Sequence, residues 1–448
     1  MYNLFYFLFV IVFTQGLIQN LLSATVARWL IEPLIAVILL VTISRNIRRS
    51  PFMISIAFFV LIFIMSCGYH KDFNLASYTF FKPFIYSFII FYASYHARFT
   101  NNQITKLKQL IYTLVLIQLP ACVIKVIAVG GFAEKNVGTM SYSGGSLHLV
   151  FPMLVVGFLL GFYFFVKKDN KYLYLILAFI FFGVTGAKKG VPFYLLGLIL
   201  FAFLFHNVYV LKKTINFFKV VQGIAIASVL FYFSVILIPG LNKEKTIGGS
   251  FDLDWLQDKV YSYSFYDEEK DLYQGRMGGI KVLVEDLLND QTNYLTNKNL
   301  TTSFIGYKPS SFDESSYLTG NENVNEEHNR IIPTGFFRML FAMGVLGVVG
   351  FMFFYGSIFN YCRTLFFKKL NYFSAYGKAL VFGCLLFSVV IFVDFFTYSH
   401  MYTFSTIYVF YFGSVSSLQT KQRALIRAQR QRFDTNQLYI GNSAIICI

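Results

Sequence analysis

Charged residues are scarce in this chain, and acidic residues are scarcest outside one segment. Charged side chains make up 13% of the 448 residues, whereas 56% are hydrophobic and 20% are aromatic. A chain with so little polar surface cannot bury its apolar side chains in a water-soluble core, and its apolar runs of roughly 18 or more residues can span a bilayer. The composition therefore predicts a polytopic membrane protein.

Cysteine is also scarce, and the motifs of many soluble enzymes are missing. The five cysteines form no C-x-x-C pair and none lies in the longest polar segment, so we expect neither a disulfide framework nor a zinc site. The chain has no P-loop, no G-x-G-x-x-G and no H-E-x-x-H. Lys and Arg beside membrane spans account for the net charge of +16. We therefore expect no cofactor, no metal and no nucleic-acid partner.

Apolar runs separated by polar breaks predict an all-α fold with about twelve membrane helices. Helices one to nine fall within residues 1–240, helices ten to twelve within 333–418, and a basic cytoplasmic tail follows at 419–448. The first run has no Lys or Arg before it and no cleavage site, so we interpret it as a retained span. The runs lie near 3–21, 24–43, 52–69, 75–95, 109–129, 146–166, 172–186, 190–206, 220–239, 335–358, 376–395 and 397–417.

Lys and Arg set the predicted orientation. They gather in alternate short loops, which face the cytoplasm by the positive-inside rule, as does the tail KQRALIRAQRQRF. We therefore predict a multi-pass protein of the cytoplasmic membrane with both termini in the cytoplasm. The loop residues are Arg45, Arg48, Arg49, Arg98, Lys106, Lys108, Lys167, Lys168, Lys171, Lys212, Lys213, Lys219, Arg363, Lys368 and Lys369.

One long polar segment, residues 241–332, holds most of the acid. Its 92 residues contain 16 of the 22 acidic and 9 of the 38 basic residues, and the predicted orientation puts it outside the cytoplasm. A structureless loop of this length is uncommon unless it is functional, so we predict an ordered, partly helical extracytoplasmic cap. Within it, GRMGGIKVLVEDLL has helical apolar spacing with Arg276 at its start, and EEHNRIIPTGFFRML leads back into the membrane.

Several charges lie at membrane depth or in an outer turn. TGAKKGVP places Lys188 and Lys189 against the charge bias of the other short loops, which favours anion binding. Arg338 lies three residues into an apolar run and is expected to face a cavity or an acid. Arg28 and Glu32 share one helical face and are expected to pair with each other or with substrate. Further candidates to line a groove for a lipid diphosphate are Lys82, Lys125 and Asp394.

Three segments together resemble the O-antigen polymerase and O-antigen ligase superfamily of bacterial surface-polysaccharide assembly. They are a small-residue turn with basic residues after a span (GAKKG), a Gly-Arg at a helix start in a large outer loop (QGRMGGIKVLVEDLL), and His-Asn before a Gly-rich span (EEHNRIIPTGFFRMLFAMGVLGVVG). Each motif alone is weak, whereas their order around one outer loop is distinctive. The family commonly has Arg where this chain has Lys188 and Lys189, so either lysine is a candidate for that role.

This resemblance implies a glycosyltransferase of the bacterial inner membrane that uses a glycan donor linked to a polyprenyl (undecaprenyl) diphosphate. We expect it to join lipid-linked oligosaccharide repeat units into a surface polysaccharide, either O-antigen of lipopolysaccharide or capsule. The implied partners are the carrier-linked oligosaccharide and membrane lipids, with a chain-length regulator and a flippase as further candidates. The candidate catalytic residues are His328, Glu327 and Arg276, and the candidate substrate-binding residues are Lys188, Lys189, Asn329, Arg330 and Arg338.

These residue types suit the implied reaction, and each also has a structural alternative. Fixed cations would stabilise the developing charge of a diphosphate leaving group. The acceptor hydroxyl needs a base, for which His328 is suited near neutral pH, with Glu327 or Glu326 as substitutes. Alternatively, His328 hydrogen-bonds the loop backbone, the two lysines of GAKKG extend to lipid headgroups, and Arg276 pairs with loop acids.

Two other functions share much of this pattern. An O-antigen ligase has the same set of parts, and the residues do not separate it from a polymerase. A lipid-linked oligosaccharide flippase or exporter also has about twelve spans, but it is expected to have two matching halves with short loops on both faces. The single long loop and the absence of a visible half-repeat favour chemistry at one face.

Overall fold

The structure of the protein is a computed structural model. The residues that it describes are 1–44, 52–97, 99–129, 131, 136, 138–140, 147–166, 169–185, 191–212, 217–238, 241–264, 304–306, 309, 335–397 and 413. Within these residues the fold is helical and contains no β-strand. The helices are α1 (Tyr2–Leu21), α2 (Ala24–Ile43), α3 (Met53–His70), α4 (Leu75–His96), α5 (Asn101–Val129), α6 (Leu147–Phe165), α7 (Asn170–Thr185), α8 (Val191–Phe205), α9 (Phe217–Leu237), α10 (Leu253–Ser264), α14 (Gly335–Lys369) and α15 (Ala375–Thr397), with a π-helical turn at His206–Val210 and a 3₁₀ turn at Leu370–Tyr372.

A helix lies at each of the first eleven predicted spans. The predicted spans 172–186 and 190–206 form two separate helices, α7 and α8. The predicted twelfth span, 397–417, and the basic tail lie outside the described residues except for a few positions, so the count of twelve stays a prediction. Of the long loop, residues 241–264, 304–306 and 309 are described, and the first of these segments contains the helix α10. The predicted helix at GRMGGIKVLVEDLL lies outside the described residues.

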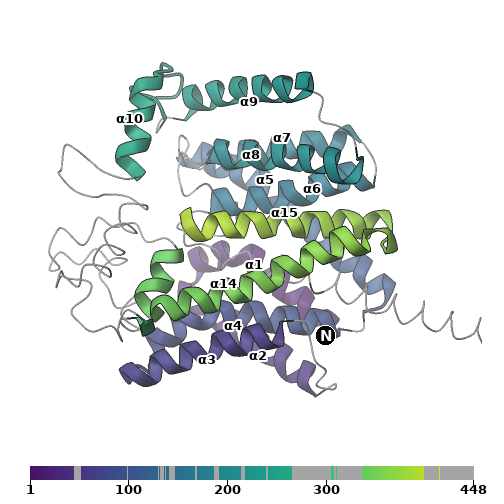
Figure 1. The fold of residues 1–448 in the computed structure, drawn as a ribbon, viewed down its shortest axis with the longest axis vertical. Helices are drawn as coiled ribbons and strands as arrows, with labels where there is room; N and C mark the ends of the chain where they lie inside the picture. The colour runs from purple at the N-terminus through teal and green to yellow at the C-terminus, as the bar shows by residue number, and fades with distance from the viewer. Residues whose placement is uncertain are drawn as a thin grey trace, which may run out of the picture.

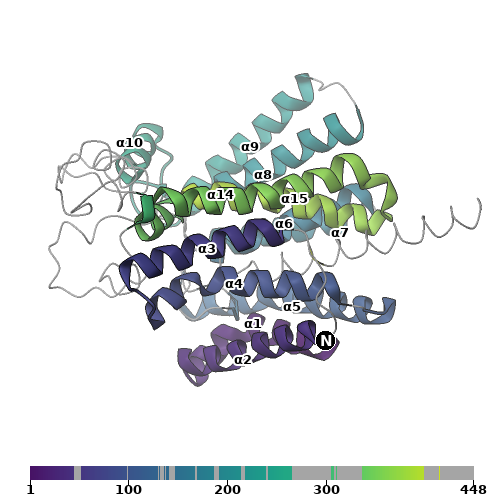
Figure 2. The ribbon, with the colours of Figure 1, turned by 60° about the horizontal axis from the view of Figure 1, so that its bottom comes forward.

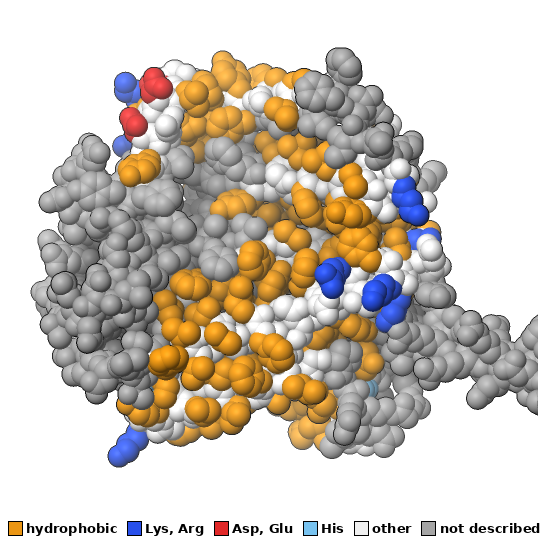
Figure 3. All heavy atoms as spheres, viewed as in Figure 1, with side chains coloured by type: hydrophobic (Ala, Val, Ile, Leu, Met, Phe, Trp, Pro, Cys, Tyr) orange, Lys and Arg blue, Asp and Glu red, His pale blue; other side chains and the backbone are white. Residues whose placement is uncertain are grey.

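The helices carry the features of a membrane-embedded protein. Five of those described are long and apolar enough to cross a bilayer, namely Tyr2–Leu21, Met53–His70, Thr105–Val129, Ala342–Lys369 and Ala375–Phe392. Large apolar side chains cover much of the outer surface, and Ile54, for example, is 81% exposed (Figure 3). A surface this apolar exceeds what water-soluble monomers expose.

The bundle has two distinct ends, which lie at the left and right of Figure 1. We call the left end the loop end: α3 ends there, α4 and α14 begin there, and α10 lies beside it. We call the right end the basic end: the N-terminus lies there, α5, α7 and α15 begin there, and α6 and α14 end there. Figure 2 shows α14 packed beside α15 and α3, with α1 and α2 forming the outermost pair.

The main core is centred on α6, which packs against α15, α7 and α8. The contact with α15 is close because Gly161 has no side chain: a Cβ there would lie 2.4 Å from the carbonyl oxygen of Ala379. Small residues at such contacts let membrane helices approach and gain van der Waals packing without a hydrophobic driving force. A second apolar cluster joins α3, α4, α14 and α15 near the loop end.

Candidate functional site

At the loop end, α14 is broken at Gly344. This residue has φ 66° and ψ −163°, a backbone conformation that essentially only glycine adopts. The break separates residues 335–343 from the long remainder of the helix (Figure 1). Carbonyl groups before the break and amides after it therefore lose their hydrogen-bond partners within the helix. Non-helical backbone at membrane depth is tolerated only where protein or a water-filled cavity covers it.

A short segment of the long polar loop, Phe304–Gly306, covers this break. A Cβ on Gly344 would lie 2.5 Å from the backbone carbonyl group of Phe304. A Cβ on Gly306, which has φ 88°, would lie 2.4 Å from the amide nitrogen of Met343. The two backbones are therefore in direct contact, and the loop is fixed to α14 at this point.

The last turns of α3 hold the loop segment through side-chain hydrogen bonds. Nε2 of His70 lies 2.7 Å from the carbonyl oxygen of Gly306, and because a carbonyl oxygen only accepts, Nε2 carries the proton. The Ser66 hydroxyl lies 3.0 Å from the carbonyl oxygen of Ile305 and 3.4 Å from that of Ala342. Ser66 thus bridges the loop and the last turn before the break in α14.

The turn between α3 and α4 directly follows His70 and is held by its own hydrogen bonds. Lys71, which follows it, adopts a left-handed conformation with φ 52° that ends α3. The buried carboxylate of Asp72 accepts a hydrogen bond of 2.9 Å from Nδ2 of Asn74. Asn74 in turn caps α4, because its Oδ1 accepts from the amide of Ser77 at 2.9 Å. The polar residues of this turn therefore form one connected network.

A second buried polar cluster lies at the base of the turn that carries Lys188 and Lys189. Nδ2 of the buried Asn136 donates to the carbonyl oxygen of Thr185 at 3.2 Å, and Sγ of Cys122 lies 3.1 Å from the Thr185 hydroxyl. Oδ1 of Asn136 is buried and accepts no hydrogen bond from the described residues. Thr185 is the last residue of α7, so in the sequence the GAKKG segment directly follows a residue that these hydrogen bonds hold in place.

The same cluster reaches α1 through Thr139. Its hydroxyl donates to the carbonyl oxygen of Phe13 at 2.7 Å, and its own carbonyl oxygen accepts from the amide of Gly16 at 2.9 Å. Its amide donates to Oε1 of Gln118 on α5 at 2.8 Å. The loop-end halves of α1, α5 and α7 are therefore joined by polar contacts as well as by apolar packing.

The beginning of the long loop packs beside the end of α7. Leu241 and Leu256 are buried in one cluster with Val184 and with residues of α9. The described parts of the loop thus contact the bundle at two places, beside α7 and α9 and at the break in α14. Figure 1 places α9 and α10 at the top of the molecule and α3 at the bottom, so these contacts lie on different sides of the loop end.

An ion pair lies within the bundle, two turns from the loop end. Nζ of Lys82 on α4 contacts Oε1 of Glu32 on α2, and their side chains are 18% and 39% exposed. The Lys82 amine also lies 5.5 Å from the centre of the Tyr86 ring, and the Tyr86 hydroxyl lies 3.2 Å from that of Tyr78. Both charges at this depth are therefore compensated.

The predicted site residues fall almost entirely outside the described part of the chain. Lys188, Lys189, Arg276, Glu327, His328, Asn329 and Arg330 lie outside it. Arg338 lies on the first turns of α14, before the break, and its helix is described but its side chain is not. These assignments stay predictions. The structure describes the helices that adjoin these residues in the chain. They are the end of α7, which precedes Lys188 and Lys189, and the first turns of α14, which carry Arg338.

The sequence did not identify His70, Ser66 or Asn136. No periodic pattern marks the first two, because both act through hydrogen bonds to a distant backbone. The partner of Glu32 was also missed: it is Lys82 of α4. Among the described residues, no group of three or more His, Cys, Asp or Glu side chains could hold a metal ion.

Comparison of the chain with models of protein families, with curated proteins and with solved structures gives no match.

Proposed function

We propose that the protein is an integral membrane glycosyltransferase that polymerises oligosaccharide repeat units carried on a polyprenyl diphosphate. The observation that supports this most is the break in α14 at Gly344, covered by Phe304–Gly306 of the acidic loop. In the sequence, the segment EEHNRIIPTG, which contains His328 and two acids, ends at the first residue of α14, ahead of this break. Discontinuous helices at membrane depth are typical of sites that bind polar ligands.

In the proposed reaction, the acceptor hydroxyl oxygen attacks the anomeric carbon of the carrier-linked glycan. A new glycosidic C–O bond forms, the C–O bond to the diphosphate breaks, and the polyprenyl diphosphate leaves with the bonding electrons. His328, assisted by Glu327, takes the hydroxyl proton. Arg276, Lys188 or Lys189, Arg330 and Arg338 stabilise the diphosphate, and Asn329 holds a sugar hydroxyl or the carrier phosphate.

The proposed topology has twelve crossings, the loop end outside the cytoplasm and both termini inside. Exposed basic residues lie near the start of α5 (Lys106) and the end of α14 (Arg363 and Lys368), and they support this orientation because Lys and Arg favour the cytoplasmic face. In this orientation the acidic loop and the break in α14 face the compartment where lipid-linked repeat units would be joined. The asymmetry between the two ends favours chemistry at one face over alternating access.

The test is reconstitution of the purified protein in liposomes with a lipid-linked oligosaccharide. The wild type is expected to form a ladder of covalently joined repeats on a gel, and Arg276→Ala is expected to form none. Arg363→Ala, which removes an exposed arginine at the basic end, is the matched control and should retain the ladder.

Two results of the same assay would overturn the proposal. Transfer of a single finished glycan to an added lipid acceptor, without a ladder, would identify a ligase. Movement of carrier-linked glycan across the bilayer without any covalent product would identify a flippase.

A further inference from the structure

A cavity of about 380 Å³ lies between α5, α6, α7 and the start of α15, away from the proposed glycan site. It extends along α5 from Lys108 to Leu116, roughly 12 Å at 1.5 Å per residue, and along α7 from Lys171 to Phe179. Its volume lies in the range of small-molecule sites, roughly 300–1,000 Å³. The cavity is therefore long and narrow, and it runs from the basic end toward the middle of the bundle.

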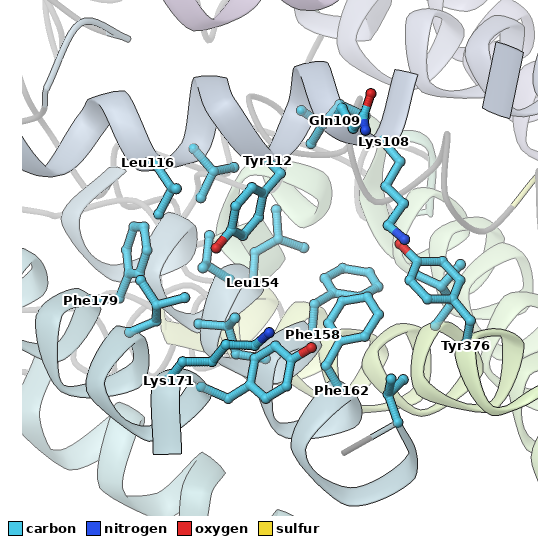
Figure 4. Close-up of a pocket in the computed structure, with 18 of the residues that line it drawn as sticks. Lys108, Gln109, Tyr112, Leu116, Leu154, Phe158, Phe162, Lys171, Phe179 and Tyr376 are labelled. Atoms are coloured by element: carbon cyan, nitrogen blue, oxygen red, sulfur yellow. The ribbon is translucent and has the colours of Figure 1, made fainter. Parts of the chain in front are cut away.

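The deep part of the cavity is apolar and its outer part is cationic. Phe158 and Phe162 of α6 form its floor, and the amines of Lys108 and Lys171 both point toward the space beside these rings (Figure 4). Among the described residues that line the cavity, none is acidic. Aliphatic and aromatic side chains cover most of the remaining wall.

Both lysines contact a tyrosine ring, and Lys171, whose Nζ lies 5.1 Å from the centre of the Tyr172 ring, also has a carboxylate nearby. Nζ of Lys108 lies 3.7 Å from the centre of the Tyr376 ring, a cation–π contact that fixes the amine while leaving its charge uncompensated by a carboxylate in that contact. Nζ of Lys171 lies 3.5 Å from Oδ2 of Asp169, which is outside the cavity lining. The Lys171 side chain is 59% exposed, and a solvated pair of this kind is weak. The outer part of the cavity therefore keeps a net positive charge.

We propose that this cavity binds an anionic glycerophospholipid of the leaflet at the basic end. One acyl chain lies in the apolar part toward Leu116 and Phe179, and the headgroup phosphate lies between Lys108 and Lys171. Basic pockets between membrane helices on the cytoplasmic side are suited to such headgroups. A free small anion would leave the apolar length of the cavity empty, whereas a lipid uses both parts. The site is independent of the proposed glycosyltransferase activity.

Native mass spectrometry of the purified protein tests this, with dioleoyl phosphatidylglycerol and dioleoyl phosphatidylcholine present at equal concentration. The wild type should retain the anionic lipid in preference to phosphatidylcholine. In Lys108→Ala/Lys171→Ala, the ratio of bound anionic lipid to bound phosphatidylcholine should fall roughly tenfold. Arg363→Ala/Lys368→Ala removes two exposed cations at the same end, outside the cavity lining, and should keep it. An equal loss in both double variants would overturn the proposal, because it would mean general surface attraction.

A second variant separates the acyl chain from the headgroup. Leu116→Trp fills the deep end of the cavity and leaves both lysines, so it should weaken binding of the dioleoyl lipid while short-chain dihexanoyl phosphatidylglycerol still binds. Displacement of the dioleoyl lipid by inorganic phosphate at equal concentration would contradict the proposal and identify a small-anion site. Unchanged binding of the dioleoyl lipid by Leu116→Trp would also contradict it.

Discussion

The loop end and the basic end of the bundle use polar residues in different ways. At the loop end, buried side chains such as Ser66, Asp72 and Asn136 form hydrogen bonds within connected networks. At the basic end, the charges of Lys106, Arg363 and Lys368 are exposed. Buried polar groups cost free energy unless they are fully paired, whereas exposed lysines at a membrane surface cost little. The contrast indicates that the loop end is held in a specific arrangement by buried hydrogen bonds, whereas the charges of the basic end face outward.

The largest expected effect comes from the break in α14. Gly344→Ala and Gly306→Ala each force a Cβ into a facing backbone and into a conformation with positive φ. The strain alone should lower the free energy of unfolding by roughly 1–3 kcal/mol. Gly356→Ala is the matched control in the same helix: a Cβ there meets no atom within 4 Å, and the change should stabilise the helix by about 1 kcal/mol. Thermal unfolding in detergent measures all three, and equal shifts for Gly344→Ala and Gly356→Ala would contradict the account.

The ion pair between α2 and α4 should give the next largest effect. Lys82→Met leaves the Glu32 carboxylate uncompensated and should lower the free energy of unfolding by about 1–2 kcal/mol. This is less than the roughly 3–5 kcal/mol expected for a fully buried pair, because the Glu32 side chain is 39% exposed. The double variant Lys82→Met/Glu32→Gln should recover most of the loss. Unfolding of the four proteins of this cycle provides the measurement. Strictly additive effects would mean that the two charges are not coupled.

Asparagines at the two ends give a matched comparison. Asn136→Ala removes the donor to the carbonyl oxygen of Thr185 within a buried cluster, and should lower the free energy of unfolding by about 1 kcal/mol, the usual net contribution of one hydrogen bond. Asn360→Ala removes an exposed amide whose oxygen accepts a hydrogen bond from Arg363, and should change the free energy of unfolding by less than about 0.5 kcal/mol. Denaturant unfolding of both variants under one condition tests the difference. Equal losses would remove the distinction between the ends.

The smallest expected effect concerns Glu244 in the long loop. Hydrogen bonds from the Ser250 hydroxyl and amide hold the pKa of this exposed carboxyl below its usual value of about 4.3. Because the pKa is lowered in the folded state, the stabilisation is present above the unfolded-state pKa and is lost as the pH falls through the folded-state pKa. Ser250→Ala should therefore lower the unfolding temperature slightly at pH 7 and less at acidic pH. A difference that grows in acid would have the wrong sign.

The helices were predictable from the sequence, but their long-range contacts were not. Apolar runs bounded by polar breaks correspond to α1–α9, α14 and α15, because a bilayer selects helices by length and hydropathy. The break at Gly344 depends on contact with Phe304, forty residues earlier, and the glycines of this run also fit an unbroken helix. Glu32 was expected to pair with Arg28 or substrate, yet its described partner, Lys82, lies fifty residues away.

The sequence predicted which segments of the chain form the candidate site, but not the contacts that hold them. The sequence indicated the re-entry point of the long loop and the GAKKG turn, and the structure describes the helices that adjoin them, α7 up to Thr185 and α14 from Gly335. The roles of His328 and Arg276 come from the resemblance and stay predictions. His70 and Ser66, which hold the loop segment against α14, were missed because hydrogen bonds to a distant backbone leave no periodic pattern in a sequence.

The proposed glycosyl transfer takes place at the loop end. Its most direct test is the initial rate of polymer formation by folded, reconstituted protein. His328→Ala should lower this rate by roughly 100-fold to 10,000-fold, the range expected for loss of a general base. Arg363→Ala/Lys368→Ala, at the basic end, should leave it within roughly twofold of the wild type. A His328→Ala protein as active as the wild type, in a preparation that forms the ladder, would contradict the assignment of the site.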